Sequence, residues 1–258
     1  MRLIPLCLLA AAASAAEAPP DHARYAAALK EFRSQEGRSL AALQATGTSA
    51  EERRAAIDDV RERLVDEPAG PLTRSVATLL GSASPAEARL LLAALAEAKA
   101  AGATPQVAAL AGQAGSPVRV DAALALAELG GAKAVPVLAA LAKDEAIAED
   151  VVQALAKVAG PGVTDAFNAG IRDAKADLPA RVALIKAAVV RNNRAVAAAL
   201  CATVVEEPMR LESQKALLKL ATSADLPALR QAEQAVVNAA TKAALGRLIA
   251  KLEKPEGK

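Results

Sequence analysis

The sequence predicts an all-α fold, a right-handed α-solenoid in which antiparallel helix pairs repeat about every 30 residues. Two observations support this prediction. Residues 117–141 contain a complete helix-turn-helix unit, and similar units recur toward the C-terminus. The composition agrees with it. Hydrophobic residues make up 53% of the chain and aromatic residues only 1%, so the helices must pack closely through small side chains.

The first helix of this unit is expected to begin at Pro117, with Ser116 as its capping residue. Apolar residues at helical spacing form one stripe, at Val120, Ala123, Leu124 and Ala127. The charged residues fall outside the stripe, at Arg119, Asp121 and Glu128. Gly130 and Gly131 are expected to end the helix, because glycine readily adopts the left-handed conformation after a helix C-terminus. A second apolar run at 134–141 follows at once and predicts a returning helix.

The unit is repeated downstream. Val-Pro-Val-Leu at 135–138 returns as Leu-Pro-Ala-Leu at 226–229, about three periods later. Between them, the segment 154–160 repeats 125–131, and Phe167 takes the position of Leu138. Four units with one period are hard to obtain by chance, so the pattern predicts an α-helical solenoid.

These residues also resemble a known family. Val118-Arg119, the run at 122–130 and Ala-Val-Pro-Val-Leu at 134–138 are similar to the short bacterial HEAT repeat of the phycobilisome-lyase type. The resemblance extends over roughly 85–238 and implies a HEAT-like protein-binding scaffold. It is broken at two places: Ala-Glu at 148–149 replaces the Val-Arg pair, and Arg-Asn-Asn-Arg at 191–194 replaces the glycine turn.

Residues 1–16 have the pattern of a secretory signal peptide. Arg2 precedes an apolar run at 3–13, and small residues at 13–16 form a cleavage site. The alternative, a membrane anchor, conflicts with the length of the run, which is too short for a bilayer about 30 Å thick. The protein is therefore expected to be periplasmic or secreted.

The rest of the chain divides into three parts. Residues 17–50 are expected to form an N-terminal helical cap, with a helix at 19–36 and a loop-rich segment after it, and a partner-binding arm is the alternative. The HEAT-like solenoid occupies 51–238. Residues 239–258 form a C-terminal capping helix, opened by Thr241, and a tail. A basic amphipathic membrane helix is the alternative for this last helix.

Two helix starts in this scheme have strong capping signals. Ser49 with Glu52, and Ser84 with Glu87, have the serine and glutamate spacing of a capping box. The helix after Ser49 is expected to bury four apolar residues, Ala56, Ile57, Val60 and Leu64. Its charged residues, including the pair Asp59 and Arg63, are expected on a solvated face.

Composition and motifs argue against catalysis, metal binding and nucleic-acid binding. The formal net charge is only +2, which gives no strong field for nucleic acid or membranes. His22 is the only histidine, and the sequence has no phosphate-binding loop and no nucleophile elbow. Once the signal is removed, Cys201 is the only cysteine, expected as a buried small hydrophobe rather than a reactive thiol. We therefore expect no enzyme activity, no cofactor and no metal.

Recognition of a protein remains the best-supported function. If the second helix of each unit lines the concave surface, as the resemblance implies, a polar ridge there consists of Lys143, Asn168, Arg172, Arg230 and Gln234. Its arginines are suited to the carboxylates of an extended partner; ordinary solvated residues are the alternative. The sequence thus predicts a non-catalytic, exported protein-protein interaction scaffold whose partner is a protein of unknown identity. An amphipathic helical protein that binds lipid or a membrane surface is the second hypothesis.

Overall fold

The computed structural model describes the backbone of residues 22–254, and the side chains of this range except those of 22–29 and 32. Every regular element in the described range is helical, which confirms the all-α prediction. The signal-peptide prediction for 1–16 lies outside the described residues. The α-helices of the N-terminal half are α1 (His22–Gln44), α2 (Ala50–Asp66), α3 (Pro71–Leu79), α4 (Pro85–Glu97), α5 (Thr104–Gly112), α6 (Arg119–Leu129) and α7 (Gly131–Leu141). Those of the C-terminal half are α8 (Ala148–Lys157), α9 (Val163–Arg172), α10 (Leu178–Val190), α11 (Ala197–Thr203), α12 (Glu207–Leu220), α13 (Leu226–Ala235) and α14 (Ala239–Leu252).

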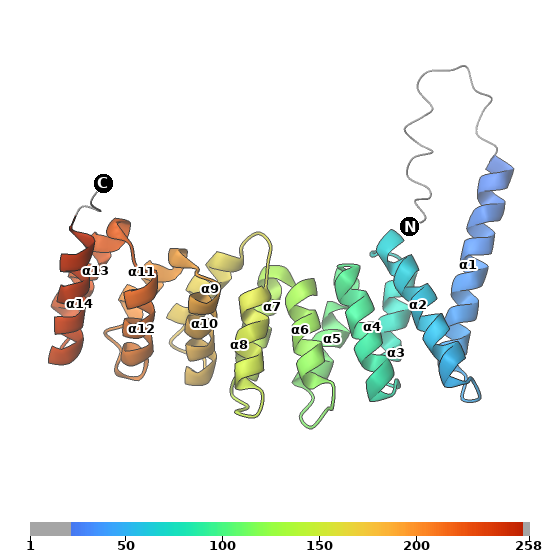
Figure 1. Ribbon diagram of the computed structural model, residues 1–258, viewed down its shortest axis with the longest axis horizontal. Helices are drawn as coiled ribbons and strands as arrows, with labels where there is room; N and C mark the ends of the chain where they lie inside the picture. Colours follow the sequence, from blue (N-terminus) through green and yellow to red (C-terminus); the bar gives the residue numbers. More distant parts are fainter. Residues whose placement is uncertain (1–21, 255–258) are drawn as a thin grey trace, which may run out of the picture.

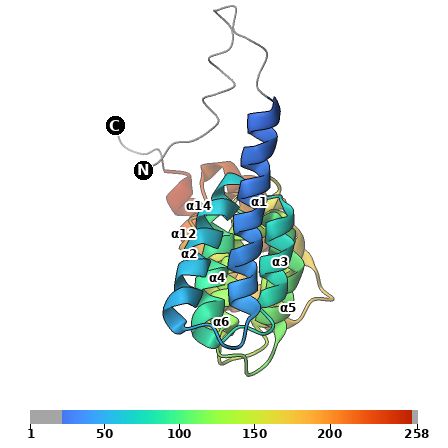
Figure 2. The ribbon, with the colours of Figure 1, turned by 90° about the vertical axis from the view of Figure 1, so that its right-hand side faces the viewer.

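The helices form an elongated row of two layers. The even-numbered helices α2 to α14 contact one another in numerical order and form the layer nearer the viewer in Figure 1. The odd-numbered helices α3 to α13 contact one another in the same way behind them. Figure 2 looks along the row and shows α2, α4 and α6 on one side and α3 and α5 on the other. Helix α1 packs on α2 and α3 at one end of the row.

The hydrophobic core lies between the two layers and consists mainly of leucine, valine and alanine. The positions aligned between repeats lie deep in it. Leu138 in α7, Phe167 in α9 and Leu229 in α13 each have 0% of their surface exposed. The predicted equivalence of Leu138 and Phe167 is therefore consistent with the positions that these side chains occupy.

The predicted capping boxes are present. At both Ser49 and Ser84, the serine hydroxyl accepts the N–H of the glutamate three residues later, and that glutamate accepts the serine N–H. These contacts satisfy N–H groups that have no partner inside the helix. The four apolar residues predicted on the inner face of α2 are buried.

A residue with positive φ follows each of four successive even-numbered helices. These residues are Lys99 after α4, Gly131 after α6, Gly160 after α8 and Asn192 after α10. Asparagine tolerates the left-handed region better than most residues with a side chain. Asn192 thus supplies, in the 191–194 turn, the left-handed conformation that glycine supplies one repeat earlier.

Helix α6 corrects the sequence prediction. It begins at Arg119 rather than Pro117, and the Ser116 hydroxyl accepts the N–H of Val118, at 3.5 Å, instead of capping the helix. Seven of its 11 residues are buried, Arg119 among them at 9% exposure, so the expected single apolar stripe is wrong. The cause is that α6 contacts α4 and α8 on its flanks as well as α5 and α7 behind it.

Three further local predictions need correction. Helix α1 runs unbroken through Gly37, where a loop was expected, because Leu40 and Leu43 pack on the core and outweigh the cost of about 1 kcal/mol for a helical glycine. Arg63 is buried, at 8% exposure, rather than on a solvated face. Helix α14 begins at Ala239, and Asn238 accepts the N–H of Thr241 as its cap.

Candidate binding surface

The outer side of the even-numbered helices, here called the front face, has a repeated stripe. On α4 the stripe consists of Arg89, Leu92, Ala93 and Ala96, and on α6 of Asp121, Leu124, Ala125 and Glu128. In each stripe, the other three residues follow the first by three, four and seven positions, so all four lie on one side of their helix. Because neighbouring stripes are parallel, shallow grooves form between the helices.

The N-terminal groove lies over α4, α6 and the end of α8 and has a volume of about 220 Å³. Its charges are largely paired within the protein. Arg89 Nε lies 3.0 Å from Asp121 Oδ2, and Glu128 forms an ion pair with Lys99. Lys157, at the end of α8, has no ion pair among the described residues. This groove therefore offers a partner little unpaired charge.

The C-terminal groove lies over α8, α10 and α12 and has a volume of about 290 Å³. Its apolar floor consists of buried or half-buried side chains, namely Val152, Ile185, Val189 and Ala216. Val190, at one edge, is 53% exposed. An open groove with this floor suits the side chains of a protein partner better than it would enclose a small molecule.

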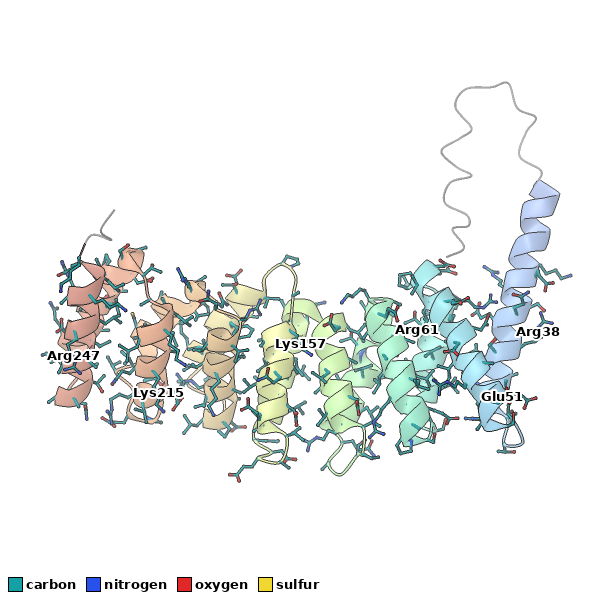
Figure 3. The ribbon with its side chains drawn as sticks, in the orientation of Figure 1. Arg38, Glu51, Arg61, Lys157, Lys215 and Arg247 are labelled. Carbon is teal, nitrogen blue, oxygen red and sulfur yellow. The ribbon has the colours of Figure 1, made fainter. Side chains whose placement is uncertain are left out.

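Charged residues form the rim of the C-terminal groove. They are Glu149, Lys186, Glu212, Lys215 and Lys219. Lys215 Nζ lies 2.8 Å from Glu212 Oε1, and Glu149 Oε1 accepts a hydrogen bond of 3.2 Å from Gln153. Lys186 and Lys219 are exposed and have no ion pair within residues 22–254. Figure 3 shows Lys157 on α8 and Lys215 on α12, both in the front layer.

The binding residues predicted from the sequence lie elsewhere, in the odd-numbered layer. Lys143 follows α7, Asn168 and Arg172 lie on α9, and Arg230 and Gln234 lie on α13. Helix α11 contacts both α9 and α13 and separates them. The predicted ridge therefore consists of polar positions on helices that are not all neighbours.

Two residues of this ridge are engaged within the protein. The Asn168 side-chain amide donates a hydrogen bond of 3.3 Å to the carbonyl oxygen of Ala195. The Arg230 guanidinium forms an ion pair with Glu253, near the C-terminal end of α14. Lys143, Arg172 and Gln234 are exposed and remain candidates for contact with a partner.

A third groove, of about 250 Å³, lies between α11 and α13 in the odd-numbered layer. Cys201 lines it, but this side chain is only 6% exposed, and burial raises the pKa of its thiol to about 11. A thiol with a raised pKa is a poor nucleophile near neutral pH. The prediction that Cys201 is a buried hydrophobe is confirmed.

The C-terminal groove was not predicted from the sequence. Each of its lysines is an exposed residue on an amphipathic helix, and nothing in the spacing along one helix shows that residues from α10 and α12 share a rim. The available signal was the spacing of Glu212, Lys215, Ala216 and Lys219 on α12, which equals the spacing of the stripes on α4 and α6.

Within residues 22–254, no group of three or more histidine, cysteine, aspartate or glutamate residues is placed to hold a metal ion. None of the described helices combines the length and hydropathy needed to cross a bilayer. No protein-family model, curated protein or solved structure matches this chain.

Proposed function

We propose that the protein is a non-catalytic, exported scaffold for protein-protein interaction, built as a right-handed solenoid of antiparallel, HEAT-like helix pairs. The observation that supports this most directly is the front face. It extends along the row of even-numbered helices, and the stripe spacing of α4 and α6 returns on α12 at Glu212, Lys215, Ala216 and Lys219. Long, open surfaces of this kind bind extended partners in repeat proteins.

The repeated turns support the solenoid. Left-handed residues recur after α4, α6, α8 and α10, and the equivalent leucine or phenylalanine of α7, α9 and α13 is fully buried. Neighbouring units thus use the same turn and the same core position.

Export is supported by the pattern of residues 1–16 alone. N-terminal sequencing of the exported product should find a chain that begins near Glu17.

The lipid-binding alternative has less support. A membrane-surface helix needs an exposed apolar stripe. In α14, the helix for which this alternative was considered, Leu245, Leu248 and Ile249 are buried against the rest of the protein. Its basic residues therefore flank a face that is already covered.

Affinity capture tests the proposed function. The full chain is immobilised and exposed to an extract of the source cells, and retained proteins are identified by mass spectrometry. Two charge-reversal variants are run in parallel: Arg172→Glu with Arg230→Glu in the odd-numbered layer, and Lys186→Glu with Lys219→Glu on the front face. We expect a saturable protein partner that one folded variant loses.

Two results would contradict the proposal. The first is that no protein is retained above a blank matrix. The second is that the chain floats with anionic phospholipid vesicles and gains helix, as a lipid-binding protein would. Small-angle scattering tests the architecture separately. A compact globule of this length has a radius of gyration of about 18 Å, and the solenoid should exceed it clearly.

A further inference from the structure

We propose that the C-terminal groove binds an acidic segment of a protein partner and holds one of its apolar side chains against Val189 and Val190. This inference rests on the proposed scaffold function and specifies its site and the chemistry of its partner. It depends on three features of the groove: an apolar floor, an exposed valine at its edge, and lysines without partners on its rim.

The floor provides the apolar contact. Val152 and Ile185 are nearly inaccessible, at 4% and 1% exposure, whereas Val190 is 53% exposed. The buried side chains fix the shape of the floor, and Val190 leaves apolar surface in contact with water. Covering such surface on binding is favourable. An apolar side chain of a partner is therefore expected to contact Val190.

The rim provides the charge selectivity. Lys186 lies on α10, and Lys215 and Lys219 lie one turn apart on α12, whereas Glu149 lies on α8. Glu212 neutralises Lys215, and Glu149 is hydrogen-bonded to Gln153, so the three lysines and two glutamates leave the rim with one net positive charge. On the α10 and α12 side, Lys186 and Lys219 have no ion pair within the described part of the chain. Two unpaired cations beside an apolar floor favour carboxylates over lysine or arginine side chains in a partner.

Comparison with the N-terminal groove supports the C-terminal groove as the binding site. It has the same stripe geometry on the same face, but its arginine is paired with Asp121 and its Glu128 with Lys99. Lys157 is its only lining residue with an unpaired positive charge among the described residues. The C-terminal groove combines two unpaired lysines with an exposed valine, and therefore offers both parts of an acidic and apolar recognition site.

The test uses a random peptide library displayed on phage and selected on the full chain. We expect the enriched peptides to combine aspartate or glutamate with leucine, isoleucine, valine or phenylalanine. The most enriched peptide is then synthesised with a fluorescent label, and its affinity is measured by anisotropy. Because exposed ion pairs contribute modestly, reversing both charges in Lys186→Glu with Lys219→Glu should weaken binding about tenfold.

Matched controls distinguish the groove from general electrostatics. Lys157→Glu reverses an unpaired lysine on the same face but in the other groove and should leave the affinity within about twofold. Val190→Ser should weaken binding, whereas Val65→Ser, at a valine of 52% exposure on α2, should not. Circular dichroism verifies that each variant is folded.

Several outcomes would overturn the inference. They are enrichment of basic or neutral peptides, no enrichment at all, equal binding to the variant with both lysines reversed, or an equal loss in Lys157→Glu. Binding of anionic vesicles that these lysine variants abolish, without selection of acidic peptides, would assign the groove to lipid instead. If the library fails but affinity capture returns a partner, this inference is wrong while the scaffold function stands. If capture fails but the library gives acidic peptides, the scaffold function is wrong, and only the preference of the groove for acidic, apolar peptides stands.

Discussion

Helices α6 and α10 each have a buried arginine in the first turns, and α8, which lies between them, has none. Arg119 Nε donates to the carbonyl oxygen of Ala111 at the end of α5, and its Nη1 contacts Asp144 in the turn after α7. Arg181 repeats both contacts, to the carbonyl oxygen of Ile171 and to Glu206. Each arginine thus joins three consecutive segments of the row.

The unit that begins with α8 has only part of this arrangement. Asp144 accepts the N–H of Ala146, and one repeat later Asp173 accepts the N–H of Lys175 in an equivalent turn. Asp144 also contacts an arginine, which holds the pKa of its carboxyl below the usual value, but Asp173 forms no ion pair in the described structure. The position of the arginine in α8 is occupied by the Ala-Glu pair at 148–149.

The difference shows that the repeat has two separable means of cohesion. Apolar packing is present in every unit, with Phe167 fully buried in the unit that lacks the arginine. The buried arginine contacts are present in the units of α6 and α10 and absent from the unit of α8. Since buried polar contacts require good geometry, they fix how one unit is oriented on the next. The unit formed by α8 and α9 lacks the buried arginine in its first turns, and its polar links to the next unit are of another kind: Asn168 donates to the carbonyl oxygen of Ala195, and Arg191 donates to that of Val158.

The largest expected effect comes from removing an arginine. Arg181→Met keeps the apolar stem of the side chain but leaves Glu206 and the Ile171 carbonyl without their donor, which should lower the free energy of unfolding by about 2 kcal/mol. Arg119→Met should act in the same direction. Urea denaturation monitored by circular dichroism measures both variants.

The control for these variants is Arg172→Met, because Arg172 is exposed and has no ion pair among the described residues. It should change the free energy of unfolding by less than about 0.5 kcal/mol. If Arg181→Met were as mild as this control, the arginine contacts would not contribute to cohesion, and the comparison between α8 and its neighbours would lose its basis.

The parts of the fold that depend on local chemistry could be predicted from the sequence. The capping boxes at Ser49 and Ser84 were correct, because each involves residues three positions apart. The burial of Arg119 was missed, because helical periodicity assumes one buried face and α6 has neighbours on three sides. The continuation of α1 through Gly37 was missed for a similar reason: packing of later leucines, rather than local propensity, decides it.

The candidate site was less predictable than the fold. Arg230 was predicted to bind a partner, but an acidic residue of the C-terminal segment neutralises it. The lysines of the C-terminal groove lie on different helices, and only the packing of α10 on α12 brings them to one rim. Both results depend on contacts between repeats, which the pattern within a single repeat does not contain.

A smaller and pH-dependent effect is expected at the joint between α2 and α4. These two helices are again connected by an arginine, because Arg53 on α2 forms an ion pair with Glu87 on α4. This contact, with the Ser84 capping bonds, lowers the pKa of Glu87 from 4.5 to about 2. The unfolded chain therefore binds the proton at a higher pH than the folded chain, so the stabilisation is complete above pH 4.5 and is lost as the pH falls toward 2.

Glu87→Gln tests this joint, because glutamine retains the capping-box geometry and removes the charge. The carboxylate is 18% exposed, so solvent screening reduces its contribution, and we expect a loss of about 1–2 kcal/mol near neutral pH. The difference in the free energy of unfolding between Glu87→Gln and the wild-type protein should shrink as the pH is lowered toward about 2. A difference that is independent of pH would show that the ion pair is not its source.

The smallest expected effect concerns the left-handed turns. Lys99 and Asn192 have φ of 52° and 53°, where Gly131 and Gly160 stand in the units between them. A lysine in this region costs about 1 kcal/mol, whereas asparagine is better tolerated. Lys99→Gly should therefore stabilise the protein by about 0.5 kcal/mol, because the gain in backbone energy exceeds the loss of the exposed ion pair with Glu128.

Thermal unfolding separates the contributions to this turn. Lys99→Gly should raise the midpoint by about 1–2 °C and Asn192→Gly by less. The opposite change, Gly131→Ala, should lower it. A β-carbon there would meet Ala159 O at 3.7 Å, an ordinary contact, so the cost of Gly131→Ala comes from the backbone conformation rather than from a clash. A lower midpoint in Lys99→Gly would instead mean that the ion pair between Lys99 and Glu128 on α6 outweighs the backbone strain at Lys99. Exposed ion pairs between even-numbered helices would then contribute more to stability than their exposure indicates.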